Sequence, residues 1–399
     1  MALNTCMYSW KSVAWVVAFS GLLSACGRAN SSLPLSPSNA STPQLPSFGA
    51  GQRLSNQNAP LLGASGADAS YLYVETETPV AYPIFEFEIN SGSKKGPRAP
   101  ICAWEPTYNQ SGTNVDPGGR SISVDRSGHV WIPSAVLDAP PAGQGSTYEF
   151  AANCGTVEGT WYTPPFTIPD SIGFGLRSAK YISFSEHAAA SGFYATGSGI
   201  AEFLGNKHYP DRYLFVPRRL LGHAIFPGPV VGDSSGNIFA LFQSDVDSPN
   251  HVFEFVRGRG SAVELRLKDL PEVHGIEGTT NPDPSRFFFD AKDDFLLPSG
   301  QHLLVWKPPY DAKPVRRIPL RRRSYSCTLN VENSLLACGV APLPGASVQT
   351  PEVDFYSYPS GTYLYAIRGF KDGLDANAYV VSVTFVQSPA THTSQVKER

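Results

Sequence analysis

The pattern Gly-x-Ser-x-Gly occurs at residues 232–236, with Ser234 at its centre. In hydrolases this pattern places a nucleophilic serine on a sharp turn between a strand and a helix. Here the following residues, 237–242, are Asn-Ile-Phe-Ala-Leu-Phe, which is typical of a β-strand. We therefore interpret Ser234 as a turn residue and predict no catalytic residue. The sequence also lacks a phosphate-binding Gly-Lys loop, a dinucleotide fingerprint and a His-Glu-x-x-His motif.

Cys327 and Cys338 are symmetric about residues 332–333, the centre of a predicted turn. Antiparallel partners have Cα atoms ~4.5–5.5 Å apart, which a disulfide can span. We predict a Cys327–Cys338 disulfide, with two buried thiols as the alternative. Cys102 and Cys154 could form a second disulfide between neighbouring strands. No spacing of cysteine and histidine suggests zinc, and we predict no metal site from these residues.

A dense basic run could bind anionic lipid headgroups or glycans. We favour the alternative that these charges keep an exposed outer strand from pairing with another chain. The formal net charge of −3 provides no general attraction for nucleic acid, so we predict no nucleic-acid partner. The run consists of Lys313, Arg316, Arg317, Arg321, Arg322 and Arg323.

Six similar strand segments recur along the chain and must position these residues. They begin at residues 84, 147, 200, 252, 302 and 352, so the intervals are 63, 53, 52, 50 and 50 residues. A period near 50 residues with short strands and abundant turn residues is typical of a β-propeller. The sequence therefore predicts an all-β fold with six blades.

Each blade is predicted to contain an inner strand, a tight turn, a return strand, the repeated segment and an outer strand. Residues 125–128 and 233–236 follow the pattern Asp-x-x-Gly at the turn. The aspartate accepts hydrogen bonds from backbone N–H groups two residues on, and the glycine supplies a positive φ. Asp293 replaces the glycine in the fifth blade. In the third blade we expect strands at 181–184 and 192–196, with a longer turn that contains Glu186 and His187.

The last predicted strand, residues 378–385, has no blade of its own, whereas the first blade lacks an inner strand. Placing this strand inside the first blade closes the ring and leaves no open sheet edge. Tyr379, Val381 and Val383 would then lie on the face opposite Val380 and Ser382.

The N-terminal region predicts export. Residues 1–25 contain an apolar run at 12–23 that is too short to span a bilayer and fits a signal peptide. The segment Leu23-Ser24-Ala25-Cys26 resembles a bacterial lipobox. The resemblance implies cleavage after Ala25 and lipidation of Cys26, which would anchor the protein to a bacterial membrane. Gly27 favours the outer membrane if the organism has two. Residues 26–62 are predicted to be a disordered tether, residues 63–386 the propeller and residues 387–399 a flexible tail.

Residues 65–386 resemble six-bladed propellers of the NHL and gluconolactonase-like group, on the strand pattern and the Asp-x-x-Gly turns. That resemblance implies a ligand site at the pore, in loops that here hold polar residues. Some members hold calcium there, but residues 66–70 (Gly-Ala-Asp-Ala-Ser) replace the motif with the first metal-binding glutamate. We therefore predict no resident cofactor, with calcium as the alternative. The candidate pore residues are Trp104, Glu105, His223, His274, Asp283 and Asp375.

These observations favour an exported, lipid-anchored propeller that binds a protein or glycan ligand as a scaffold of the cell envelope. Two alternatives remain at this point. One is a calcium-dependent, lactonase-like hydrolase with its site at the pore, and the other is a structural spacer.

Overall fold

The structure is a computed structural model, and the residues it describes all lie in one unit, Phe48–Arg399. The predicted signal peptide, the tether and the tail lie outside these residues. No described helix is long and apolar enough to cross a bilayer. The described residues are 69–77, 83–90, 95–97, 99–104, 122–124, 130–135, 145–150, 157–162, 178–182, 187–194, 197–204, 212–216, 226–243, 250–258, 261–270, 287–341, 350–369 and 378–386.

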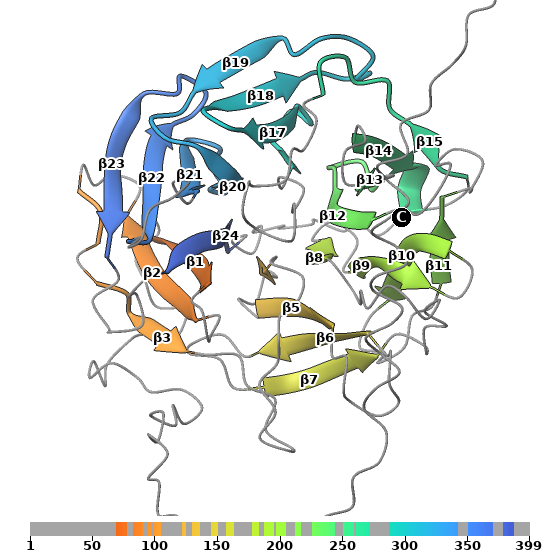
Figure 1. The fold of residues 1–399 in the computed structure, drawn as a ribbon, viewed down its shortest axis with the longest axis horizontal. Coiled ribbons are helices and arrows are strands. Elements are labelled where there is room, and N and C mark those ends of the chain that lie inside the picture. Colours follow the sequence, from red (N-terminus) through yellow and green to blue (C-terminus); the bar gives the residue numbers. More distant parts are fainter. Residues whose placement is uncertain are drawn as a thin grey trace, which may run out of the picture. The chain divides into compact units, whose positions relative to one another are not determined.

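The described strands form six four-stranded antiparallel sheets, which confirms the all-β propeller fold (Figure 1). In chain order we call them the first to the sixth sheet. A single short 3-10 helix, η1 (Val256–Gly258), occurs among the described residues. The first sheet has the order β24-β1-β2-β3, with β24 (Tyr379–Phe385), β1 (Ala69–Glu77), β2 (Ile84–Asn90) and β3 (Cys102–Trp104).

The other five sheets are made of strands consecutive in the sequence, because short turns between antiparallel strands allow each to fold locally. The second sheet contains β4 (Ser123–Val124), β5 (Val130–Ala135), β6 (Gly145–Phe150) and β7 (Val157–Tyr162). The third contains β8 (Ser178–Ile182), β9 (His187–Tyr194), β10 (Gly197–Leu204) and β11 (Arg212–Phe215). The fourth contains β12 (Phe226–Gly232), β13 (Ile238–Gln243), β14 (Asn250–Phe255) and β15 (Val263–Glu264). The fifth contains β16 (Phe288–Phe289), β17 (Phe295–Ser299), β18 (His302–Trp306) and β19 (Arg316–Pro319). The sixth contains β20 (Ser324–Leu329), β21 (Leu335–Val340), β22 (Glu352–Ser357) and β23 (Tyr363–Arg368).

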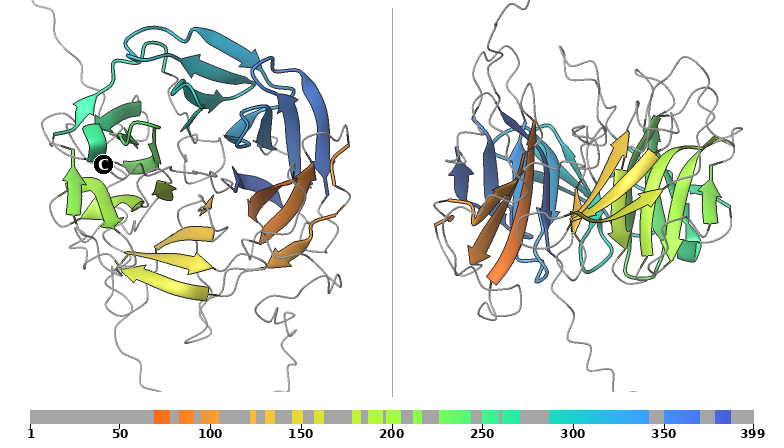
Figure 2. Two further views of the ribbon diagram at one scale, coloured as in Figure 1. Left: turned by 180° about the vertical axis from the view of Figure 1, so that it is seen from behind. Right: turned by 90° about the horizontal axis from the view of Figure 1, so that it is seen from below.

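Neighbouring sheets lie face to face around the ring (Figure 2), and buried side chains join them. Separate clusters link the sixth sheet to the first, the first to the second, the third to the fourth, the fourth to the fifth and the fifth to the sixth. Strand β5 contacts β8, which links the second sheet to the third. The first, fourth, fifth and sixth sheets therefore bury side chains on both faces, and this explains why strands such as β17, β18 and β21 are apolar on nearly every residue.

Strand β24 pairs with β1, as the sequence predicts for the C-terminal segment. Its other contacts are with the sixth and second sheets. The N–H of Val383 donates to Ser326 Oγ at 3.0 Å, and Ser382 Oγ accepts a hydrogen bond from the N–H of Ile122 at 3.3 Å. Gly339 in β21 packs closely against the side chain of Val380. The closing strand is thus held by three sheets.

The predicted alternation of faces in β24 is wrong. Glu75 of β1 pairs with Ser382 of β24, whereas the next residue, Thr76, pairs with Val380, so the pairing skips one residue of β24. Because this bulge adds one residue to β24, Val380 and Val383 both join the cluster between the sixth and first sheets.

The repeated segments are confirmed as the third strand of each sheet, but their faces are not equivalent. Phe85 and Phe253 face the preceding sheet, whereas Leu303 and Val353 at the same repeat position face the following sheet. A shift of one residue moves a whole set of side chains to the other face of a strand. The repeats of the fifth and sixth sheets are therefore one residue out of phase with the first and fourth.

The third sheet also differs from the prediction. Strand β9 begins at His187 and ends at Tyr194, so the return strand starts five residues earlier than the predicted 192–196. His187 pairs with Ile182 at the end of β8. His187 therefore belongs to the strand ladder rather than to a long turn.

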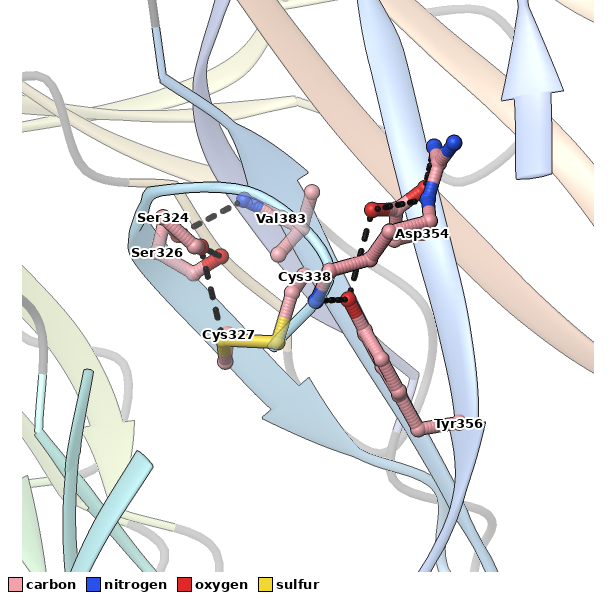
Figure 3. The surroundings of a disulfide bond; sticks show 8 residues. Ser324, Ser326, Cys327, Cys338, Asp354, Tyr356 and Val383 are labelled. Atoms are coloured by element: carbon pink, nitrogen blue, oxygen red, sulfur yellow. Dashed lines mark hydrogen bonds and ion pairs between the residues drawn. A yellow bond between two sulfur atoms is a disulfide. The ribbon is translucent and has the colours of Figure 1, made fainter. Parts of the chain in front are cut away.

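The predicted disulfide between Cys327 and Cys338 is confirmed. The two residues are direct partners of β20 and β21, with Cα atoms 4.1 Å apart (Figure 3). Ser324 lies beside the sulfur of Cys327, at 3.5 Å from Oγ to Sγ. Cys102 is also disulfide-bonded, and Cys154, its predicted partner, lies outside the described residues.

The contact between Gly339 and β24 yields a first prediction. A Cβ atom at residue 339 would overlap Val380 Cγ1, and the branched valine has few alternative rotamers. We expect Gly339→Ala to lower the free energy of unfolding by about 1–3 kcal/mol, the usual cost of overpacking. Urea unfolding followed by tryptophan fluorescence measures this change.

The double variant Gly339→Ala/Val380→Ala is the control. Removing the valine methyl groups relieves the clash, so the two substitutions should be clearly non-additive. Additive effects would show that the close approach of β21 and β24 does not limit stability.

Candidate functional site

A pocket of about 560 Å³ lined by several charged residues lies between the fifth and sixth sheets. Its lining comes from the turns β16–β17 and β20–β21 and from the ends of β18 and β22, which all lie at one edge of these antiparallel sheets. The volume is in the range of ~300–1,000 Å³ that small-molecule sites occupy. The lining residues are Asp290, Ala291, Lys292, Asp294, Lys307, Val315, Arg316, Glu332, Asn333, Tyr358 and Pro359.

Each tight turn at this edge is held by its first polar residue. Asp290 Oδ1 accepts hydrogen bonds from the N–H groups of Lys292 at 2.9 Å and Asp294 at 3.0 Å. Asp233 in the fourth sheet and Asn330 in the sixth hold their turns in the same way. This confirms the role predicted for the aspartate of the Asp-x-x-Gly turns.

The residue at the glycine position links one turn to the turn before it. Asp293 has φ +58° and Asn333 has φ +52°, a left-handed conformation that Asp and Asn adopt more readily than most residues. The carboxylate of Asp293 accepts from the N–H of Ser234 at 2.9 Å and from its hydroxyl at 2.5 Å. Asn333 Oδ1 accepts from the N–H of Ala291 at 3.1 Å. The turns of the fourth, fifth and sixth sheets are thus connected in series.

Tyr358, at the end of β22, is a central group in the wall of the pocket. Its hydroxyl donates to Asp290 Oδ2 at 2.7 Å and accepts from Arg316 Nη2 at 3.2 Å. The Arg316 guanidinium also lies over the Tyr358 ring, 5.4 Å from the centroid, and donates to the Pro359 carbonyl. Burial and the bond to Asp290 raise the pKa of Tyr358, so this phenol stays a hydrogen-bond donor at neutral pH. Arg316 is therefore oriented before any ligand arrives.

Asp294 differs from the other acidic groups of the pocket. It is 6% exposed, and its carboxylate accepts no hydrogen bond from any described residue. Burial, together with the nearby charge of Asp290, raises the pKa of Asp294 above its usual value. Lys307, Arg316 and Lys292 oppose this rise from the pocket walls. The carboxylate oxygens of Asp294 keep contact with solvent through the pocket, where a ligand can reach them.

The three cations of the pocket form no ion pair within the described chain that would compete with an anionic ligand. Among the described residues, no carboxylate lies within the 4.0 Å of an ion pair from Lys292, Lys307 or Arg316. By contrast, the rest of the predicted basic run is used within the fold. Lys313 and Arg317 pair with Asp269, and Arg321 and Arg322 pair with carboxylates of β22. The pocket thus combines free cations with a buried acceptor.

The candidate residues predicted for the pore are not brought together by the described part of the chain. Trp104 lies in β3, is 4% exposed and packs on Phe150, with ring centroids 4.9 Å apart. It contributes to the core between the first and second sheets. The other predicted residues, with the lipidated cysteine, lie outside the described residues: Glu105, His223, His274, Asp283, Asp375 and Cys26.

Ser234 is a turn residue, as predicted. Strand β13 follows it, and its hydroxyl donates to Asp293, which belongs to the turn of the next sheet. No group of three or more His, Cys, Asp or Glu side chains in the described ranges could hold a metal ion. The calcium site of the pore stays a prediction because its residues lie elsewhere.

Sequence reasoning missed the pocket itself. Lys307 and Tyr358 carried no local signal, because each follows a strand end without a motif. The sequence Asp-Ala-Lys-Asp-Asp at 290–294 was the available hint, since its two last acidic residues exceed what one turn requires. Only Asp290 is needed to hold that turn.

Comparisons with known proteins concern the fold. No family model and no curated protein matches the sequence. A protein of unknown function from Bacteroides caccae is similar at 11% identity with a TM-score of 0.47, over 80% of this chain and 100% of that chain. The Dos1 propeller is similar at 9% identity and 0.40, over 76% and 69% of the two chains. Hydrazine synthase from Kuenenia stuttgartiensis is similar at 11% identity and 0.41, over 68% and 72%. Nothing about function follows from these similarities.

The chain of turns yields a second prediction. Asp293→Gly keeps the left-handed turn but removes both hydrogen bonds to Ser234, so we expect a loss of about 1–3 kcal/mol in the free energy of unfolding. Chemical denaturation measures the change. Asp293→Ala should cost more, because alanine also disfavours the positive φ. Equal stability of Asp293→Gly and the unaltered protein would contradict a stabilising role for this link.

The buried carboxylate yields a third prediction, with a defined pH dependence. Because the pKa of Asp294 is raised in the folded protein, ionisation destabilises the fold above that pKa and has no effect below the unfolded value. We expect Asp294→Asn to raise the free energy of unfolding at pH 7 by about 0.5–2 kcal/mol, the range of single stabilising substitutions. The gain should vanish near pH 3.

Urea unfolding at the two pH values tests this prediction. Asp311→Asn is the control, because Asp311 is exposed and lies outside the pocket. A lower stability of Asp294→Asn at pH 7 would show that the three cations compensate the buried charge.

Proposed function

We propose that this protein is an exported, lipid-anchored six-bladed β-propeller that binds a small ligand, or a small group on a larger partner, at the cell envelope. The binding site is the pocket between the fifth and sixth sheets. The observation that carries the proposal is the pairing of a 6% exposed carboxylate, Asp294, with three cations that form no ion pair with a described carboxylate. Lys292 and Lys307 are exposed, so Asp294 is the group whose burial a ligand would offset.

The six-bladed ring supports this role because it provides a rigid frame. Each sheet packs on its neighbours, and the closing strand contacts the sixth, first and second sheets. A site between two blades is then formed by side chains on strand ends, whose positions are set by the sheets. Binding requires little ordering of the protein, which favours affinity.

Export is supported by the cysteines. Cys327 and Cys338 form a disulfide, and Cys102 is disulfide-bonded. Disulfides are common in exported proteins and rare in reducing compartments. Together with the lipobox-like segment that ends at Cys26, they favour an exported protein attached by lipid to a bacterial membrane.

The anchor gives a fourth prediction. Cys26→Ser removes the thiol that would carry the lipid, so the protein should move from the membrane fraction to the soluble fraction of a bacterial host. Fractionation and mass spectrometry of the N-terminal peptide measure both effects. Cys6→Ser is the control, since Cys6 lies in the predicted signal peptide ahead of the cleavage site and its replacement should leave partitioning unchanged. A Cys26→Ser protein that stays with the membrane would contradict lipidation at this residue.

Binding is tested separately by a thermal-shift panel of small acids, sugars, amino acids and phosphates. The proposal expects at least one compound to stabilise the unaltered protein and to lose this effect in Lys307→Gln. A panel without any such compound would count against a binding function of the pocket.

A further inference from the structure

We propose that the pocket between the fifth and sixth sheets recognises a sugar acid, that is, a polyhydroxylated ring bearing a carboxylate. This inference rests on the proposed binding function and specifies its ligand. It follows from the number, the charge and the availability of the polar groups in the pocket.

The acid group is assigned to the cations. Lys292, Lys307 and Arg316 come from three different segments, the turn β16–β17, the end of β18 and the start of β19. No carboxylate of the described chain forms an ion pair with any of them. Arg316 is fixed by Tyr358 and the Pro359 carbonyl, which leaves its guanidinium oriented but without a counter-ion. A planar carboxylate matches the donors of a guanidinium and a neighbouring ammonium group.

The hydroxyl groups are assigned to Asp294. Asp290 already accepts three hydrogen bonds, from two backbone N–H groups and from the Tyr358 hydroxyl. Asp294 accepts none from the described residues and lines the same pocket. Glu332 also lines the pocket, but it is exposed and accepts from Asn330 Nδ2, so Asp294 is the buried acceptor that remains. A buried carboxylate can accept hydrogen bonds from two adjacent hydroxyls, as a sugar ring presents them.

The charges argue against an ammonium-bearing ligand. Lys307, Arg316 and Lys292 all act electrostatically on Asp294. A positively charged ligand group placed at Asp294 would meet these three cations, whereas a neutral hydroxyl would not. The pocket is therefore better suited to an acidic polyol than to an amino acid.

The size of the pocket also fits. Its volume of about 560 Å³ exceeds the ~30 Å³ that one water molecule occupies in the liquid many times over. A single sugar acid would leave room for bridging waters, which serve polar sites nearly as well as direct contacts. The ligand could be a free sugar acid or a uronic acid residue of a polysaccharide, which present the same chemistry.

Isothermal titration of the full-length chain in detergent tests the inference. The probes are D-glucuronic acid, D-glucose, acetate and glycine. We expect D-glucuronic acid to bind at least about tenfold more tightly than D-glucose or acetate, because it alone contacts both the three cations and Asp294. Glycine, a zwitterion without hydroxyls, should not bind measurably.

Three variants test the contributions of the cations and of Asp294 to binding separately. Lys307→Gln should weaken D-glucuronic acid by about tenfold and leave D-glucose unchanged. Asp294→Asn is isosteric and should weaken both sugars by a similar factor, since both present hydroxyls. Lys313→Gln is the matched control, because Lys313 is 72% exposed, pairs with Asp269 and lies outside the pocket. It should bind all probes as the unaltered protein does.

The outcomes are distinct. Binding of glycine in preference to D-glucuronic acid, abolished in Asp294→Asn, would overturn the sugar-acid assignment and keep the proposed binding function. Equal binding of D-glucose and D-glucuronic acid would overturn the role of the cations. If neither these probes nor any compound of the wider panel responds to Lys307→Gln, the binding function itself fails. Trigalacturonate that binds like its own monomer, D-galacturonic acid, supports a polysaccharide source, whereas binding of the monomer alone supports a free sugar acid.

Discussion

The pairing of β24 with β1 is the constraint on which the rest of the structure depends. It joins the end of the described chain to its beginning, so both faces of every sheet can be buried. Without it, the first sheet would expose an unpaired edge, which is the usual route to aggregation. The strand is also held from the side. Ser326 and Thr328 of β20 accept from the N–H groups of Val383 and Phe385, which β1 does not satisfy.

Polar side chains at one edge of the sheets connect neighbouring blades that the strands themselves do not connect. Asp293 and Asn333 occupy positions where glycine would suffice for the turn, and both use their side chains to reach the preceding turn. The mild strain of a left-handed Asp or Asn is offset by these hydrogen bonds. Asp294, the next residue after Asp293, has no such hydrogen bonds within the described chain to offset the cost of burying its carboxylate. It accepts no hydrogen bond from the described residues, and burial raises its pKa, so a donor group on a ligand would stabilise its ionised form.

The sixth sheet supports both the closing strand and the pocket. Arg321 lies between the buried carboxylates of Glu352 and Asp354, and its backbone N–H donates to the Tyr356 hydroxyl at 2.8 Å. The Tyr356 hydroxyl in turn donates to Asp354 Oδ2 at 3.3 Å (Figure 3). Burial raises the pKa of Asp354, and the bond to Arg321 opposes that rise. Breaking such a buried pair commonly costs ~3–5 kcal/mol, because it leaves an uncompensated charge. This cluster and the Cys327–Cys338 disulfide stiffen the sheet on the side facing the fifth sheet, where the pocket lies.

The sequence by itself determined the all-β propeller, the order of the strands, the closing strand and the Cys327–Cys338 disulfide. These features depend on local signals: apolar segments at a regular interval, turn residues between them, and two cysteines equidistant from a turn. Only the tertiary structure decided which neighbouring sheet the side chains of each repeat contact. One added residue, as in the bulge of β24, turns the following side chains to the other face of the sheet, and the sequence pattern does not reveal it. It also decided the pocket. Asp290 and Tyr358 are 68 residues apart, and they meet because two sheets that each fold locally then pack face to face.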